Sequence, residues 1–406
     1  MFAIIDSLLE IVSKGVRTER PKTYEIPITD NTVNAIDFRH ISTLGLTASP
    51  LARYEGGMRV MDPGFRNTVV CESSITHIDG LKGVIQCRGY SLDELVENHD
   101  FEAVAFLLTW GHLPQSRTYS SASLKNTPYH LLVEAGLAAW AATDPSKIPI
   151  FAGQELYLGK MDVVDERLIA TFAASVTITA LIYCHQNNRP FTAPDPNASV
   201  VENILLMMGV VDATTARPPT KLVRILNKLW IIYADHEMTN STAAAMHVGS
   251  SLADPIAVCM AATCAGSGPL HAGAIDLAYK MFSRVGSREN VPGGHRIYKA
   301  VDPRVKHLRA MLAELYVGQE MDGPLAVAME FDRVASTDSY FTSRHLKVNA
   351  DLYGCFVFSA MGFEPEIITA LMMTARACGI LAHWREMMGQ PPNIWRPQQR
   401  YTGARS

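Results

Sequence analysis

Apolar residues recur at helical spacing through most of the chain beyond residue 130, and this pattern constrains the fold more than any other feature. The spacing and the length of each segment suit a helix better than a strand. No regular alternation of strands with helices accompanies them, so the pattern predicts a predominantly α-helical protein. The predicted helices cover residues 132–142, 166–186, 200–211, 219–233, 241–266, 271–285, 304–315, 324–334, 353–361 and 365–388.

One short β-hairpin precedes these helices. Two strand-like runs, 75–78 and 84–87, flank an Asp-Gly pair at 79–80, which is a strong short-range hairpin signal. A Ser-x-x-Glu capping box beginning at Ser91 then predicts the start of a helix. The predicted fold class is therefore all-α with one small N-terminal β-hairpin.

The start of the chain, residues 2–16, repeats apolar side chains at helical spacing and predicts a helix followed by a loop-rich segment. It carries acidic residues, and it lacks the basic start of a secretory signal and the arginine-rich face of a mitochondrial presequence. The final residues do not end in the leucine of a peroxisomal address. We expect a cytoplasmic protein, with mitochondrial and peroxisomal locations as alternatives.

Charge and composition exclude several classes of partner. The 36 basic and 40 acidic residues give a formal net charge of −4, so no basic excess attracts nucleic acid or an anionic membrane surface. The longest apolar stretch, residues 168–183, is short for a membrane span and predicts a buried helix. The seven cysteines include no CxxC pair and mostly lie in apolar runs, which predicts reduced thiols rather than disulfides or a zinc site.

The first candidate site residue is His236, which lies between Asp235 and Glu237 just before a predicted helix of small residues. An imidazole there either faces a ligand or forms a salt bridge at the helix start, and the pattern leaves both open. The HExxH motif of zinc peptidases is absent, because Asn240 stands where the second histidine is required.

The second is His271, which follows a Gly/Pro-rich segment at 266–269 and begins a predicted helix. The positive potential of a helix amino terminus disfavours the imidazolium, and a neutral imidazole can donate a hydrogen bond to an oxygen that gains negative charge. A buried structural histidine after a hinge is the alternative.

The third is a cationic cluster in the glycine-containing segment 291–304, formed by His295, Arg296, Lys299 and Arg304. Glycines let a ligand approach the backbone, and several cations within a short segment suit a polyanion. A solvated surface turn is the alternative reading.

The fourth combines Asp351 with Arg376, each in an otherwise apolar run, and with Arg396 near the end of the chain. Desolvation raises the pKa of a carboxyl group and makes it a stronger base, as the removal of a proton next to a carbonyl requires. A buried arginine requires an acidic partner or an anionic ligand. The alternative is that the two residues pair with one another or with neighbouring acids.

At this point the sequence resembles the citrate synthase family from about the hairpin to the carboxy terminus. Each motif is weak alone, but their order and spacing together are highly specific. The segments that carry the resemblance are SITHIDGLKG at 74–83, RGY at 88–90, ADHE at 234–237, GPLH at 268–271, GHRIYK at 294–299, DPR at 302–304, AHW at 382–384, RPQ at 396–398 and YTG at 401–403.

The resemblance implies an all-helical homodimer whose subunits have a large domain and a smaller mobile domain that closes over substrate. By similarity, residues 272–356 form the small domain, and 1–271 and 357–406 form the large one. The partners implied are oxaloacetate and an acyl-CoA co-substrate, with no separate cofactor and no metal.

The roles implied by the resemblance are assigned position by position. Asp351 removes the α-proton of the acyl-CoA, His271 hydrogen-bonds the enol, and His295 polarises the ketone of oxaloacetate. The thioester that forms is then hydrolysed. The oxaloacetate carboxylates are held by His236, Arg304, Arg376 and Arg396, and Arg396 reaches them from the partner subunit. Arg296 and Lys299 contact coenzyme A.

Departures from the family pattern concern the acyl group. Members commonly read Asp-aromatic-Tyr-Ser-Gly at the catalytic acid, whereas this chain reads DLYGC at 351–355. Ala272 replaces the glycine after the catalytic histidine, and the coenzyme loop reads PGGH at 292–295. Leu352 and Gly354 change the volume beside the base, which favours an acyl group larger than acetyl, as in alkylcitrate synthases of specialised metabolism. An ordinary citrate or 2-methylcitrate synthase and a non-catalytic acyl-CoA-binding homologue are the alternatives.

Overall fold

The computed structural model divides into two compact units, Met1–Glu72 and Ser73–Ser406. It describes residues 7–13, 22–29, 32–40, 73–114, 129–283, 302–319, 323–343 and 348–395, with a few single positions besides. The boundaries predicted at 271 and 356 for a mobile domain remain a prediction.

The first unit contains a small antiparallel sheet where we predicted a helix. Strand β1, Ser7–Ser13, pairs with β2, Lys22–Thr29, and β2 pairs with β3, Thr32–Val33; a 3-10 helix, η1, covers Ala35–His40. The prediction of a helix over 2–16 was therefore wrong for residues 7–13, the part of that range that the structure describes. A spacing that suits a helix face is ambiguous in a short apolar run, and here pairing with a second apolar strand prevails, with Leu9 opposite Ile26.

The second unit begins with the predicted hairpin. Strands β4, Thr76–Asp79, and β5, Val84–Cys87, pair antiparallel, and a short β6, Tyr90–Ser91, extends the sheet to three strands. The Ser91 hydroxyl accepts a hydrogen bond of 3.2 Å from Glu94 N and caps the next helix, as the capping box predicted.

Helices make up most of the remainder, so the predicted fold class is confirmed except for the extra N-terminal sheet. They are α2 Leu92–Asn98, α3 Phe101–Trp110, α4 Tyr129–Ala141, α5 Pro149–Ala152, α6 Met161–Gln186, α7 Val200–Met207, α8 Thr220–Tyr233, α9 Asn240–Gly249, α10 Pro255–Gly266, α11 Ala274–Ser283, α12 Arg304–Leu315, α13 Gly323–Thr337, α14 Ser339–Thr342, α15 Ala350–Ala360 and α16 Pro365–Met388, with short 3-10 turns η2 Pro145–Lys147 and η3 Gln154–Leu156.

The predicted helix 241–266 is two helices. Asp254 ends the connection between them: its side chain accepts hydrogen bonds from Ile256 N at 3.0 Å and Ala257 N at 3.2 Å, and Pro255 is the first residue of α10. An acidic cap followed by proline is a helix-start signal that the apolar periodicity conceals.

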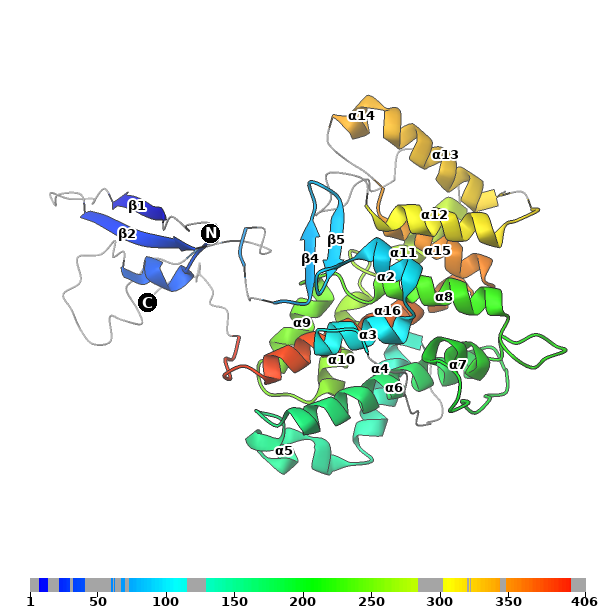
Figure 1. Ribbon diagram of the computed structural model, residues 1–406, viewed down its shortest axis with the longest axis horizontal. Helices are drawn as coiled ribbons and strands as arrows, with labels where there is room; N and C mark the ends of the chain where they lie inside the picture. Colours follow the sequence, from blue (N-terminus) through cyan, green and yellow to red (C-terminus); the bar gives the residue numbers. More distant parts are fainter. Residues whose placement is uncertain are drawn as a thin grey trace, which may run out of the picture. The chain divides into compact units, whose positions relative to one another are not determined.

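Helix α16 runs through the middle of the helical unit in Figure 1 and contacts α3, α6, α8, α9, α10, α11 and α15. It is apolar on all sides, as a central helix must be. Helices α6 and α16 are long and apolar enough to cross a membrane, but 72% and 100% of their most apolar windows are buried inside the protein. Both therefore serve as core helices, and residues 168–183 form a largely buried helix as predicted.

The cysteines in the described residues are free thiols. Cys87, Cys184, Cys259, Cys355 and Cys378 are buried, and Cys264 is exposed. The sequence predicted reduced thiols at these positions.

Charged residues hold α12 against α2 and α8, and this fixes the start of α12 where Arg304 lies. Asp93 on α2 pairs with Lys306 and lies 2.8 Å from His307 Nε2. Arg224 on α8 pairs with Glu314 at the other end of α12. The contacts of Asp93 thus lie within one turn of Arg304, a candidate site residue, and the Arg224–Glu314 pair lies at the opposite end of the helix.

Candidate active site

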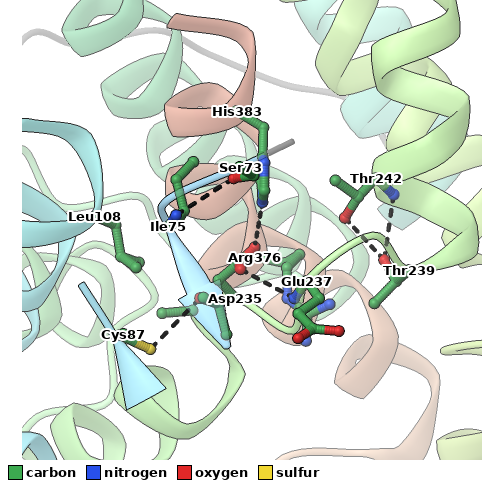
Figure 2. A network of polar contacts seen from close by, with 12 residues as sticks. Ser73, Ile75, Cys87, Leu108, Asp235, Glu237, Thr239, Thr242, Arg376 and His383 are labelled. Atoms are coloured by element: carbon green, nitrogen blue, oxygen red, sulfur yellow. Dashed lines mark hydrogen bonds and ion pairs between the residues drawn. The ribbon is translucent and has the colours of Figure 1, made fainter. Parts of the chain in front are cut away.

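The loop between α8 and α9 carries His236 and is built around a buried aspartate. Asp235 lies 3.4 Å from His383 on α16 and accepts a hydrogen bond of 3.1 Å from Glu237 N; Figure 2 shows both contacts, with Arg376 beside them. Burial opposes ionisation of Asp235, but the neighbouring His383 ring, the charge of Arg376 and a hydrogen bond from Thr76 outweigh it and lower the pKa of this carboxyl. His236 is buried, and the carboxylate next to it is used to fix the loop to α16.

Gly379 permits this close approach. A Cβ atom at this position would lie 2.4 Å from the Ala234 carbonyl oxygen and 2.6 Å from Asp235 Oδ1. The loop therefore rests on the bare backbone of α16, and its position depends on the absence of a side chain there.

Arg376 is a buried residue of α16, and its side chain is hydrogen-bonded to the carboxyl-terminal end of α8. Its Nε donates a hydrogen bond of 2.6 Å to the Tyr233 carbonyl oxygen. Burial lowers the pKa of Arg376, while the nearby Asp235 carboxylate offsets part of that effect. The direct contact of Arg376 is thus a backbone carbonyl, and Asp235 supplies the nearby negative charge that a buried arginine requires.

His271 lies in the turn between α10 and α11 and reaches the amino end of α9. Its Nε2 is 2.8 Å from Ser241 Oγ and accepts a hydrogen bond of 3.3 Å from Ser241 N. Because a backbone N–H donates to Nε2, this nitrogen is the unprotonated one, and the proton of the neutral ring sits on Nδ1.

The pKa of His271 is lowered to about 4, first by burial and then by the charge of Arg376. The prediction of a neutral imidazole is therefore confirmed, but part of the reason differs. The free amides that the ring meets belong to the start of α9, whereas α11 begins three residues after His271, at Ala274.

Asp302 joins the starts of α12 and α15. It pairs with Arg304 at 2.7 Å, and it also accepts hydrogen bonds of 3.0 Å from Arg304 N and 3.1 Å from Ala350 N. Burial raises the pKa of Asp302, but Arg304 outweighs this effect and the net shift is downward. The Arg304 guanidinium and the residue before Asp351 are thereby fixed to the same carboxylate.

Asp351 occupies the first turn of α15, where Asn349 Nδ2 donates a hydrogen bond of 2.8 Å to its Oδ2. Burial raises the pKa of Asp351 and Asp302 adds to it, while Arg304, Asn349 and Arg376 act in the opposite direction without cancelling it. The direction is the one predicted from the apolar neighbours. Its carboxylate is held by Asn349, and Arg304 and Arg376 act on it only as nearby charges.

Mutual electrostatic effects place four predicted residues in one region: Arg376 acts on His271, on Asp351 and on Arg304, and Arg304 acts on Asp351. His236 belongs to the loop that directly follows Tyr233. The remaining candidates, His295, Arg296, Lys299 and Arg396, lie outside the described residues. Their roles remain predictions.

Sequence reasoning did not assign a role to several residues that build this region. Asp302 belongs to the DPR motif at 302–304. Its bridge between two helices was not predicted, because it depends on a contact with Ala350, which lies far along the chain. Ser241 and Asn349 are ordinary helix-start residues in the sequence. The Asp235–His383 pair joins residues distant in sequence. The sequence feature that could have indicated it is the histidine within the largely apolar segment that forms α16.

We expect Gly379→Ala to lower the free energy of unfolding by about 1–3 kcal/mol, because the new methyl group collides with Ala234 and Asp235. Gly389→Ala, at the C-cap of the same helix, is the control, since the nearest atom to its added Cβ, the Glu386 carbonyl oxygen, is 3.5 Å away. Chemical denaturation of both variants measures the difference. Equal stability of the Gly379 variant and the wild type would contradict the close approach.

We expect the stability of the protein to fall as pH decreases from about 6.5 to about 4 in a way that depends on His271. The unfolded chain binds a proton at the ordinary histidine pKa of 6.5, whereas the folded ring does so only near 4, so unfolding takes up a proton in this window. Urea denaturation at pH values above and within the window should show a larger loss for the wild type than for His271→Gln. An equal loss in both proteins would show that His271 is not buried as a neutral ring.

Comparison with known proteins finds matches to citrate synthases and citrate synthase-like proteins. Residues 64–398 match the model of the citrate synthase C-terminal domain. The chain is 42% identical to the citrate synthase-like protein oryE of Aspergillus oryzae, with 94% of this chain and 93% of that protein covered. It is 34% identical to a citrate synthase of Dictyostelium discoideum over 95% of this chain and 80% of that one, and 33% identical to the alkylcitrate synthase phiJ of Fungal sp. (strain ATCC 74256) over 95% and 92%.

A solved structure shows the same fold. Citrate synthase from Thermoplasma acidophilum, in a ternary complex with carboxymethyl coenzyme A and oxaloacetate, matches with a TM-score of 0.74 and 23% identity, covering 86% of this chain and 97% of that one. The match of the family model and the identity to full-length relatives lead to one conclusion: this chain belongs to the citrate synthase family.

Proposed function

We propose that the protein condenses an acyl-CoA with oxaloacetate and hydrolyses the product thioester to a citrate-type tricarboxylate and coenzyme A. The observation that carries the proposal is the pairing of opposite pKa shifts in one region: a carboxyl with a raised pKa, Asp351, and an imidazole held neutral, His271. A base with a raised pKa and a neutral hydrogen-bond donor are what enolisation of a thioester requires.

In the first step Asp351 takes the α-proton of the acyl group, and the electron pair moves onto the thioester oxygen. The Nδ1–H of His271 is available to donate to this oxygen, because Nε2 already accepts from Ser241. The protein thus stabilises the thioester enolate with a neutral hydrogen-bond donor, which does not have to give up its proton.

In the second step the enolate carbon bonds to the ketone carbon of oxaloacetate, the thioester carbonyl re-forms, and His295 gives a proton to the ketone oxygen. Water then cleaves the thioester and releases the coenzyme A thiol. The carboxylates of oxaloacetate are assigned to His236, Arg304, Arg376 and, from the partner subunit of a homodimer, Arg396. Guanidinium groups suit this task because they bind carboxylates through paired hydrogen bonds.

Acyl-CoA is a co-substrate in this scheme, and Arg296 and Lys299 are assigned to its phosphates. A small domain of residues 272–356 would close over both substrates and exclude water until the acyl group is in place. We keep the cytoplasm as the proposed location.

For the acyl donor we favour a chain longer than acetyl, as in an alkylcitrate synthase. The buried Leu352 next to the base supports this choice, and the alkylcitrate synthase phiJ is a relative at 33% identity, beside the Dictyostelium citrate synthase at 34%. The space beside Gly354 does not add room for substrate, because the Tyr233 hydroxyl fills it. An ordinary citrate or 2-methylcitrate synthase is the alternative.

The acyl donor is tested by the rate of thiol release from a series of acyl-CoA substrates, from acetyl to decanoyl, with oxaloacetate in excess. We expect kcat/KM to be higher for a longer chain than for acetyl-CoA, because Leu352, the residue after the proposed base, departs from the aromatic family pattern. A sharp preference for acetyl-CoA would remove the alkylcitrate assignment and leave the citrate synthase alternative.

Catalysis itself is tested with Asp351→Asn, for which we expect kcat to fall by about 10²–10⁴-fold, the usual contribution of a general base. Asp162→Asn on the exposed first turn of α6 is the matched control and should leave the rate unchanged. No oxaloacetate-dependent thiol release from the wild type with any acyl-CoA would favour the non-catalytic acyl-CoA-binding homologue.

A further inference from the structure

Tyr233, the last residue of α8, carries a buried hydroxyl that the structure leaves without a hydrogen-bond partner among the described residues. The side chain is only 1% exposed. A phenol buried without a partner is destabilising, and tyrosines in protein interiors usually place this group against an acceptor. An unsatisfied donor of this kind within a candidate active site therefore indicates a partner that is supplied at another stage.

The position of the hydroxyl is set by Gly354. A Cβ atom on Gly354 would lie 2.0 Å from Tyr233 Oη and 3.3 Å from Ile275 Cδ1. The hydroxyl thus occupies the volume in which any other residue at 354 would place its side chain. Gly354 follows Asp351 by three residues in α15, and residues at this spacing lie on the same face of a helix.

The charged surroundings also point to Asp351. Burial raises the pKa of Tyr233 well above its ordinary value, and the next contribution is the charge of Asp351. The phenol therefore stays protonated and acts as a donor. The other charged groups that act on Asp351 are Arg304 and Asp302 at the start of α12 and Arg376 on α16.

The two oxygens of Asp351 are used differently. Asn349 donates to Oδ2, while Oδ1 accepts no hydrogen bond from any side chain that the structure describes. Asp351, which is partly exposed, and Gly354, against which the unpartnered Tyr233 hydroxyl lies, are thus on the same face of α15, one helical turn apart.

We propose that Tyr233 is a positioning residue for Asp351: once substrates fill the site, its hydroxyl donates a hydrogen bond to the Asp351 carboxylate and directs it toward the acyl α-carbon. This role of Tyr233 presupposes the proposed condensation activity. It assigns the Tyr233–Gly354 pair a function in holding the base, because the tyrosine hydroxyl reaches this position only where residue 354 has no side chain.

The test compares Tyr233→Phe with the wild type in thiol release at saturating oxaloacetate and acyl-CoA as a function of pH. A hydrogen bond to the carboxylate favours its charged form, so its loss raises the pKa of Asp351. We expect the acid limb of the kcat profile to move up by about one pH unit and kcat to fall by about tenfold, with KM for oxaloacetate nearly unchanged. Tyr183→Phe on α6, also buried, is the matched control and should leave both quantities unchanged.

Gly354→Ala and the double variant Tyr233→Phe/Gly354→Ala test the contact itself. The alanine methyl group collides with the hydroxyl, but without that oxygen the nearest ring atom, Cζ, would be 3.2 Å away. We expect Gly354→Ala to lose thermal stability and the double variant to recover most of it, while its pH profile stays that of Tyr233→Phe.

Three results would overturn the proposal. One is a Tyr233→Phe enzyme with the wild-type kcat and acid limb. Another is a fall in activity with the acid limb unmoved, which would make the hydroxyl a packing group only. The third is an unchanged rate with acetyl-CoA but a changed preference among longer chains, which would make it a pocket wall. Failure of the condensation activity would be recognised separately, by the absence of thiol release from the wild type.

Discussion

The burial of the Arg376 guanidinium inside an otherwise apolar helix is the constraint on which the arrangement of the site depends. A charge removed from water must be compensated, and here the Tyr233 carbonyl and the Asp235 carboxylate provide the compensation. Asp235 is in turn paired with His383. Gly379 allows the loop that supplies these groups to lie directly on α16. The same loop leads into α9, whose first turn binds the His271 ring, so one buried cation organises residues from several helices.

The chemistry follows from two environments that act in opposite directions. At the start of α15, burial and the neighbouring Asp302 raise the pKa of Asp351. At the start of α9, burial and Arg376 lower the pKa of His271. In both cases the neutral form is favoured over the form that an exposed group would have: the Asp351 carboxyl holds its proton more tightly, and the His271 ring releases its second proton more easily. Opposite pKa shifts of this kind are what the proposed division into a base and a neutral hydrogen-bond donor requires.

Features that depend on the local sequence pattern, such as the bounds of single helices, were predicted from the sequence. The bounds of 304–315 and 365–388 agree with α12 and α16, because apolar periodicity and end signals act within a few residues. Residues 2–16 were wrongly predicted as a helix, because pairing with a strand farther along the chain is not visible in a local window. In the site, the neutral state of His271 was predicted, but its contact with another helix was not. Asp302 was missed because its function arises only when two distant helix starts converge on it.

The bridge made by Asp302 has a mechanical consequence. One carboxylate accepts from the guanidinium of Arg304 and from the backbone amide of Ala350, which directly precedes the proposed base. Any rotation of that guanidinium toward an incoming anion changes the pull on the amide, and the first turn of α15 has to respond. In the proposed reaction, binding of an anion by Arg304 and the orientation of Asp351 would therefore be coupled through Asp302.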